Sequence, residues 1–185
     1  MGQGPEADSI GIFALTAVRG KSDYDVFKAL LLEYAARDLD DAKNSTIWQD
    51  LTQLPQRYGA PLGGALLAHF GGELAGCGAF AATAQPGIAE IKRVYVRGGY
   101  RRHGLARALT LSLAARAREC GYHTAAISTW PHNKEALALY QQLGFAPITP
   151  FKEHTHAQLV FLGLALGPAE SNTHLTSALL PNDHP

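Results

Sequence analysis

A basic turn that contains a glycine separates a strand-like run from a helix-like run. It reads Arg101-Arg102-His103-Gly104-Leu105-Ala106. Residues 89–96 before it alternate in character, and residues 105–113 after it repeat apolar side chains at helical spacing. The first N–H groups of a helix lack intrahelical partners and carry the positive end of the dipole, so a phosphate can accept hydrogen bonds from them. Gly104 leaves room for a ligand, and we therefore expect an anion site here.

Positive charge is concentrated around this turn. The segment from 91 to 118 contains no Asp or Glu, yet it holds half of the 16 Lys and Arg residues: Lys92, Arg93, Arg97, Arg101, Arg102, Arg107, Arg116 and Arg118. A solvated helix face accounts for Arg116 and Arg118. It does not account for the cluster from 97 to 107, which would repel itself. A compact anionic ligand would relieve that repulsion.

Composition excludes several classes of protein. A chain of 185 residues with 46% apolar and 17% charged residues is typical of one globular domain. Lys and Arg balance Asp and Glu at 16 each, which argues against nucleic acid or an anionic membrane as a partner. We find no signal peptide and no apolar run long enough to span a bilayer. Cys77 and Cys120 imply no disulfide framework, so we expect a cytoplasmic protein.

The pattern of apolar residues and turns predicts one domain at 9–167, a loose leader at 1–8 and a flexible tail at 168–185. Strands are expected at 10–18, 65–70, 74–81, 88–96, 123–129, 145–148 and 158–166. Helices are expected at 22–39, 45–59, 105–121 and 134–143. A meander followed by a β-α-β unit predicts an α/β (α+β) domain with a mixed, mostly antiparallel sheet of about seven strands and about four helices.

Two motifs resemble those of the GNAT superfamily of N-acetyltransferases. The family's phosphate motif is Gln or Arg, two residues, Gly, one residue, then Gly or Ala, and Arg101-x-x-Gly104-x-Ala106 matches it. The second motif is an Asn before a helix that carries a Tyr and ends in Gly-Phe, matched by Asn133, Tyr140 and Gly144-Phe145. The resemblance follows the element order of residues 10–166. It implies a sheet splayed between its fourth and fifth strands.

The resemblance also implies acetyl-CoA as the cosubstrate. The turn, here Arg101, Arg102, His103, Gly104, Leu105, Ala106 and Arg107, would then hold the pyrophosphate. Main-chain groups of Val94, Tyr95 and Val96 would face the pantetheine arm, since an extended arm with two amides can pair with a strand edge. Asn133 is expected to contact the same arm or to cap its helix, and both interpretations stay open.

Acetyl transfer from a thioester needs a neutral amine, and a proton helps the thiolate to leave. The resemblance assigns that proton to Tyr140, whose alternative role is a packed aromatic. Glu90 is the candidate base. Alternation would place Glu90, Lys92, Val94 and Val96 on one face, about 13 Å between Glu90 and Val94, so we expect Glu90 to act through water. An ion pair with Lys92 or a neighbouring strand is the alternative role of Glu90.

The acceptor is the least defined part of the reaction. Asp38, Asp40 and Asp41 lie at the junction of the first two helices, which shapes the acceptor pocket in this family. An acidic rim would attract a cationic amine, although a solvated charge run explains the same residues. We expect the transfer of acetyl to a primary amine by direct attack in a ternary complex, with a small amine favoured over a peptide.

Two alternative functions remain open. One is a module that binds acetyl-CoA without transferring its acetyl group, as a sensor would, and another is transfer of a different acyl group. Separately from the function, residues 158–166 offer an exposed edge strand that could pair with a second copy in a homodimer, although nothing in the sequence of this strand requires it. We expect no metal, because the one close His pair, His154 and His156, is accompanied by no Cys or carboxylate cluster.

Overall fold

The computed structural model describes residues 13–39, 42–153 and 158–167, so the predicted leader and tail lie outside the described residues. Seven strands form one sheet in the order β1-β2-β3-β4-β5-β7-β6. They are β1 (Phe13–Ala17), β2 (Gly64–Phe70), β3 (Glu73–Ala82), β4 (Ile88–Val96), β5 (Thr124–Thr129), β6 (Ala146–Pro147) and β7 (Val160–Ala165). Only the β4–β5 pair is parallel, which confirms the predicted mixed sheet.

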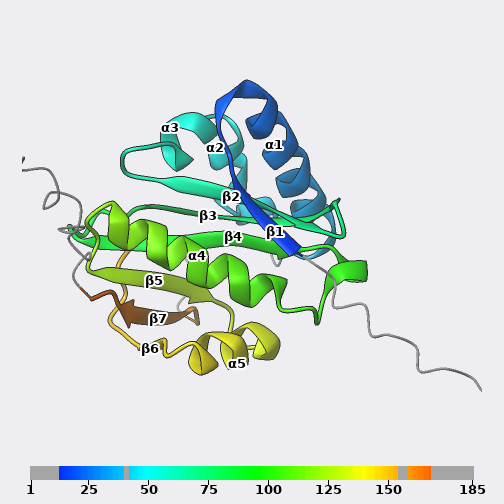
Figure 1. The fold of residues 1–185 in the computed structure, drawn as a ribbon. Helices are drawn as coiled ribbons and strands as arrows, with labels where there is room; N and C mark the ends of the chain where they lie inside the picture. The colour runs from blue at the N-terminus through cyan, green and yellow to red at the C-terminus, as the bar shows by residue number, and fades with distance from the viewer. Residues whose placement is uncertain (1–12, 40–41, 154–157, 168–185) are drawn as a thin grey trace, which may run out of the picture.

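The described residues contain five α-helices: α1 (Gly20–Arg37), α2 (Ile47–Leu51), α3 (Leu54–Tyr58), α4 (Leu105–Glu119) and α5 (Lys134–Gln142). Helices α1, α2 and α3 cover one face of the sheet, and α4 lies on the other (Figure 1). The single helix expected at 45–59 is wrong, because Gln53 leaves the helical region at φ −146° and ψ 40° and separates α2 from α3. None of the described helices has the length and apolar character needed to cross a membrane.

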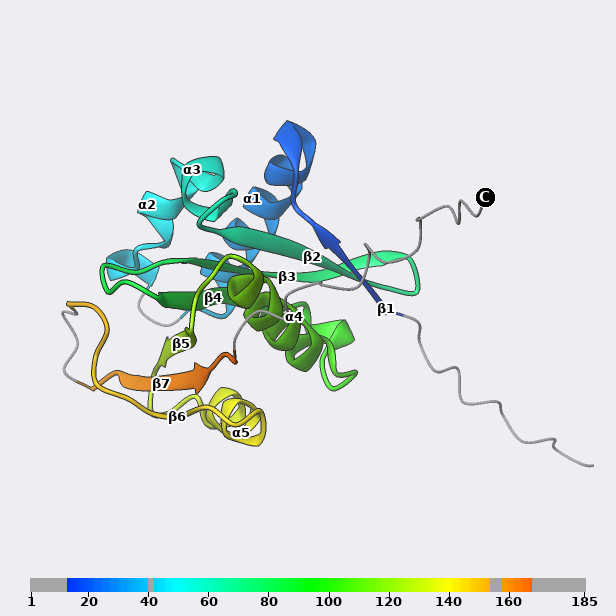
Figure 2. The same ribbon diagram turned by 60° about the vertical axis from the view of Figure 1, so that its left-hand side comes forward.

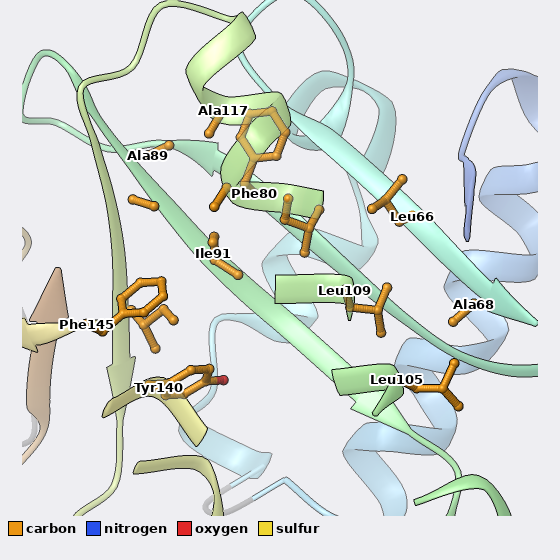
Figure 3. Packing of buried hydrophobic residues seen from close by; sticks show 14 of the residues in the cluster. Leu66, Ala68, Phe80, Ala89, Ile91, Leu105, Leu109, Ala117, Tyr140 and Phe145 are labelled. Carbon is orange, nitrogen blue, oxygen red and sulfur yellow. The ribbon is translucent and has the colours of Figure 1, made fainter. Parts of the chain in front are cut away.

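The sheet separates the two larger apolar cores. On one face, Leu105, Leu109 and Leu113 recur at a spacing of four along α4 and are fully buried against the sheet. Figure 3 shows Leu105 and Leu109 in this core. On the other face, the apolar side of α1, including Phe27 and Leu30, packs with α3. Strand β4 lies between the two cores and contributes side chains to both.

Strands β4 and β5 pair only at their beginnings. The register joins Ile88 to Thr124, Ala89 to Ala125 and Glu90 to Ala126, and it stops there. Figure 2 shows β5 and β7 set apart from the layer formed by β2, β3 and β4. The predicted splay between the fourth and fifth strands is therefore confirmed, and it opens the sheet beside residues 91–96.

A β-bulge interrupts β4 beside this opening. Cys77 pairs with Tyr95 and Ala79 with Lys92, so Arg93 and Val94 together oppose a single residue of β3. Arg93 has a φ of 60°, outside the region of an extended strand. A bulge reverses the alternation of the residues beyond it. The prediction that Val94 and Val96 share a face with Glu90 is wrong, since both pack against the α4 core.

Strand β7 is not the free edge that the sequence suggested. It lies between β5 and β6, and β6 pairs Ala146 with Gly163 and Pro147 with Leu162. The N–H of Ile148 also donates to the carbonyl of Phe161 at 3.0 Å. These contacts occupy the middle of the outer side of β7, where a second copy would have had to pair.

Candidate active site

The N-terminus of α4 has the geometry expected of an anion site. Gly104 precedes the helix with a φ of 81°, a conformation that favours glycine, and no side chain caps the helix. The first helical bond runs from the N–H of Ala108 to the carbonyl of Gly104 at 2.9 Å, so the N–H groups of residues 105–107 have no helical acceptor. A Cβ on Gly104 would meet nothing within 4 Å, which leaves the approach to these groups open.

Acidic residues of the first helices neutralise much of the acid-free window. Arg97 contacts Glu33 through Nε and Nη2, at 3.0 and 2.9 Å from Oε2. Arg101 donates to Asp38 Oδ2 at 2.7 Å and to the carbonyl of Val96 at 3.0 Å. The prediction that the whole cluster from 97 to 107 needs an anionic ligand is therefore wrong, because Arg97 and Arg101 are paired with carboxylates of the protein. The pairing across space was not visible in the sequence.

Other cations at the turn remain available. Within residues 13–39, 42–153 and 158–167, Arg102 and Arg107 form no ion pair with a carboxylate. Arg102 is exposed, with a φ of 68°. His103 is held by its Nδ1, 2.8 Å from the carbonyl of Arg101, and by the ring of Phe70 at 4.7 Å. An anion at this turn would thus meet free backbone N–H groups and the charge of Arg102 or Arg107.

A cleft of about 470 Å³ opens where β4 and β5 separate. Residues 91–94 of β4 and 127–129 of β5 line it, together with Tyr140 of α5. Its other wall includes Tyr34 of α1 and Arg57 of α3. This volume and concave shape suit a small ligand.

Tyr140 reaches this cleft from α5. It is 8% exposed, and its ring centroid lies 5.8 Å from that of Phe145. In Figure 3 its hydroxyl oxygen points away from Phe145, toward the side on which β4 and α4 lie. Burial, with a smaller contribution from Tyr34, raises the pKa of the Tyr140 phenol to about 12. Tyr140 therefore carries its proton at neutral pH. The aromatic packing that we considered as an alternative is present as well.

Asn133 caps α5. Its Oδ1 accepts a hydrogen bond from the N–H of Ala136 at 3.4 Å, so the capping interpretation is confirmed. Asn133 also lines the cleft. Its contact with a bound arm stays a prediction.

Glu90 is buried, with 6% of its surface exposed, and is surrounded by cations. Its Oε1 accepts hydrogen bonds from Lys152 and, at 3.1 Å, from Ser128, while Lys92 Nζ lies 3.7 Å from Oε2. Burial opposes ionisation, but Lys92, Lys152 and Ser128 together outweigh it and lower the pKa of Glu90. The ion pair with Lys92 that we considered is therefore present, and Glu90 is ionised at neutral pH.

Sequence reasoning missed Asp50, the centre of a buried charge cluster. Asp50 is 1% exposed. Arg93 donates to its Oδ2 from Nε at 2.9 Å and from Nη2 at 2.6 Å, and Tyr58 donates to the same oxygen. Burial opposes ionisation of Asp50, but Lys92, Arg93 and Tyr58 outweigh it, so its pKa is lowered. One signal was present, since Asp50 follows the buried Ile47 by three residues, on the apolar side of the helix.

Lys92 joins Asp50 to Glu90. Its Nζ lies 3.6 Å from Asp50 Oδ2 and 3.7 Å from Glu90 Oε2. Burial disfavours the charged form more than the two carboxylates favour it, and the pKa of Lys92 is lowered to about 8. Arg57 extends the cluster, with its Nε 2.7 Å from Asp50 Oδ1, close enough for an ion pair but not aligned for a hydrogen bond. The cleft thus carries charge of both signs on its inner wall.

Of the three expected acceptor residues, the structure describes Asp38 alone. Asp38 lines the cleft, but its carboxylate is paired with Arg101. Asp40 and Asp41 lie outside the described residues, as do His154 and His156. In the part of the chain that the structure describes, no three His, Cys, Asp or Glu side chains gather into a group that could hold a metal ion.

Comparison with known proteins identifies the family. Residues 26–145 match the model of the acetyltransferase (GNAT) family. An uncharacterised N-acetyltransferase of Schizosaccharomyces pombe is 28% identical over 154 residues, which cover 83% of this chain and 94% of that protein. The chain therefore belongs to the acetyltransferase (GNAT) family and is an acyltransferase.

Solved structures agree with this assignment. A Klebsiella pneumoniae protein described as an acyl-CoA N-acyltransferase has a TM-score of 0.64 and 27% identity, covering 84% of this chain and 98% of that one. A Salmonella typhimurium protein described as an acetyltransferase, and solved with its cofactor acetyl-CoA, has a TM-score of 0.58 and 19% identity, covering 90% and 99%. The second likeness bears on the fold alone.

Proposed function

We propose that the enzyme transfers the acetyl group of acetyl-CoA to the primary amine of a small acceptor, by direct attack in a ternary complex. The observation that carries the proposal is a cleft lined by a protonated Tyr140 and an ionised Glu90. Strand β4, which forms part of this cleft, ends at Val96, and the turn that follows it leads to the uncapped N-terminus of α4. This combination suits a donor with a pyrophosphate, a thioester and an amine acceptor.

The N–H groups of residues 105–107 would accept the pyrophosphate, helped by the charge of Arg102 and Arg107. Residues 94–96 of β4 have no strand partner on the β5 side, so their main-chain groups can pair with the two amides of the pantetheine arm. Arg101 restricts this pairing, because its Nε already occupies the carbonyl of Val96.

Two proton transfers complete the reaction. Attack forms the N–C bond and breaks the C–S bond of the thioester. Tyr140 donates its proton to the departing thiolate, and Glu90 accepts, through water, the proton that the amine loses. A covalent acyl-enzyme is disfavoured at Cys77, because that thiol is fully buried and burial raises its pKa.

The test is release of free thiol from acetyl-CoA in the presence of a panel of amines, with the acetylated products identified by mass spectrometry. We expect stoichiometric formation of thiol and acetylated amine. Binding of acetyl-CoA by calorimetry without thiol release on any amine would favour a sensor instead. Faster turnover of propionyl- or succinyl-CoA would favour transfer of another acyl group.

A further inference from the structure

We propose that Arg57 binds a carboxylate of the acceptor, so that the acceptor is an amine of the amino-acid class rather than a plain amine or polyamine. The inference rests on the proposed function, because it names the acceptor of the same cleft. It differs from the expectation of an acidic rim, of which Asp38 pairs with Arg101, while Asp40 and Asp41 lie outside the described residues.

Arg57 lines the cleft, and the two terminal nitrogens of its guanidinium group can donate hydrogen bonds to a ligand. Its Nε is buried against Asp50 Oδ1 at 2.7 Å, whereas the side chain as a whole is 35% exposed. Among the described residues, no carboxylate or carbonyl accepts from its two terminal nitrogens. A guanidinium whose Nε is ion-paired with a buried carboxylate keeps its two terminal nitrogens available, and their planar arrangement matches a second carboxylate. Asp50 thus orients Arg57 toward the ligand.

The other cations of the cleft are already engaged. Arg93 uses Nε and Nη2 on Asp50, and its Nη2 also donates to Thr46 at 2.9 Å. Lys92 lies between Asp50 and Glu90, and Lys152 donates to Glu90. Arg57 is therefore the cation of this cluster that is best placed to accept a new anionic partner.

The charge of the inner wall also favours an anionic group. Among the described residues, the single carboxylate of Asp50 lies within ion-pair distance of three cations, Arg57, Lys92 and Arg93. Asp38 also lines the cleft but pairs with Arg101, and Glu153 is exposed, where water screens its charge. Uncompensated charge away from water is unfavourable, and a ligand carboxylate would reduce it.

The order of the cluster sets the direction of the acceptor. Arg57 contacts Asp50, Asp50 neighbours Lys92, and Lys92 neighbours Glu90. A carboxylate on Arg57 therefore places the rest of the acceptor along the wall that leads to Glu90, where the amine must lose its proton. A diamine in the same position would bring a second ammonium group against Arg57 and Lys92, where like charges repel.

The experiment compares amino acids with the amines that they give on decarboxylation: phenylalanine with phenethylamine, histidine with histamine, and ornithine with putrescine. Thiol release measures kcat/KM, and calorimetry in the presence of CoA measures acceptor binding without chemistry. We expect at least one amino acid to exceed its amine about 10- to 100-fold in both measurements, as for a charged hydrogen-bonded pair. Equal or better binding of every decarboxylated amine would overturn the proposal, whether or not any acceptor is acetylated.

Variants assign the effect to Arg57. In Arg57→Gln, the ratio of kcat/KM for the amino acid to kcat/KM for its amine should fall to near unity. The fall should come from a higher KM for the amino acid, with little change in either constant for the amine. Arg57→Lys should restore part of the preference. Arg19→Gln, an exposed arginine at the far end of α1, is the matched control. If Arg57→Gln weakens both members of a pair equally while the protein stays folded by circular dichroism, Arg57 does not bind the carboxylate. Carboxylate-dependent binding without acetylation would instead contradict the proposed function alone.

Discussion

Arg93 and Asp50 form a buried ion pair across 43 positions of the sequence, with Nε and Nη2 of the arginine both donating to Oδ2 of the aspartate. The pair joins α2 to the bulge of β4. It therefore holds α2 against the strand that would carry the donor. Tyr58 and Lys92 approach the same oxygen, and Arg57 approaches the other.

Asp50→Asn should destabilise the protein strongly. The substitution leaves Arg93, Arg57 and Lys92 buried or half-buried without their shared carboxylate, which we expect to lower the free energy of unfolding by about 3–5 kcal/mol. For a chain of this size that corresponds to a fall in Tm of roughly 10 °C. Thermal unfolding by circular dichroism measures it. Asp25→Asn, which removes an exposed pair with Lys21, should change stability by less than about 0.5 kcal/mol, and an equal effect of the two variants would refute the account.

Tyr140→Phe should lower kcat at every pH while leaving acetyl-CoA affinity unchanged. The ring still packs on Phe145, but the departing thiolate loses its proton donor, so a loss of about 10²-fold is expected. Thiol release gives kcat and calorimetry gives the affinity. Tyr122→Phe is the control, because it also removes a tyrosine hydroxyl, one that donates to the carbonyl of Leu62 outside the cleft. A Tyr140→Phe enzyme as active as Tyr122→Phe would remove Tyr140 from the mechanism.

Gly104→Ala should weaken acetyl-CoA binding beyond its effect on folding. The glycine has a φ of 81°, and the added methyl would project into open space at the N-terminus of α4. Gly121→Ala, at the other end of α4 with a φ of 89° and equally open surroundings, imposes the same backbone strain away from the site. Both variants should lose about 1 kcal/mol of stability. Only Gly104→Ala should raise the Kd for acetyl-CoA, by about 10-fold, and equal Kd values would place the phosphates elsewhere.

Glu90→Gln should lower the free energy of unfolding at neutral pH, and this effect should shrink as the pH becomes acidic. The cations around Glu90 hold its folded pKa below the ordinary 4.5. The ionised carboxylate therefore stabilises the fold fully above that value, and the contribution is lost as the pH falls through the folded pKa. The variant should be about 3 kcal/mol less stable than the native protein at pH 7, with the difference shrinking toward pH 3. Glu73→Gln, on an exposed glutamate, should show no such convergence.

The activity of Glu90→Gln tests its role as the base. Turnover should fall mainly at low pH, where the amine is protonated and needs a base, and should approach that of the native enzyme at high pH, where free amine is abundant. Steady-state rates of thiol release between pH 6 and 9 give the ratio of native to variant activity. A constant ratio across this range would leave Glu90 with a structural role only.

The sequence predicted the elements around Gly104 and Tyr140 better than the contacts around Asp50 and Arg57. Gly104 and Tyr140 lie in local motifs whose spacing fixes their positions on a helix, and the strand order followed from the same local signals. The bulge at Arg93 was not predictable from the sequence. The alternation of residue types continues through this position, whereas the extended backbone is interrupted there. Asp50 and Arg57 acquire their roles from contacts between α2, α3 and β4, which no local pattern encodes.

Acetyl-CoA is proposed to bind between β4 and β5, with its phosphates at the N-terminus of α4. The most direct measurement is a titration of isotope-labelled protein with acetyl-CoA, followed by amide chemical shifts in NMR spectra. We predict the largest shifts at residues 102–107 and 94–96. Another cavity, of about 520 Å³, lies between α1 and α3 and is lined by Lys21, Tyr24 and Leu54 among others. Shifts concentrated there, with residues 102–107 unchanged, would contradict the account.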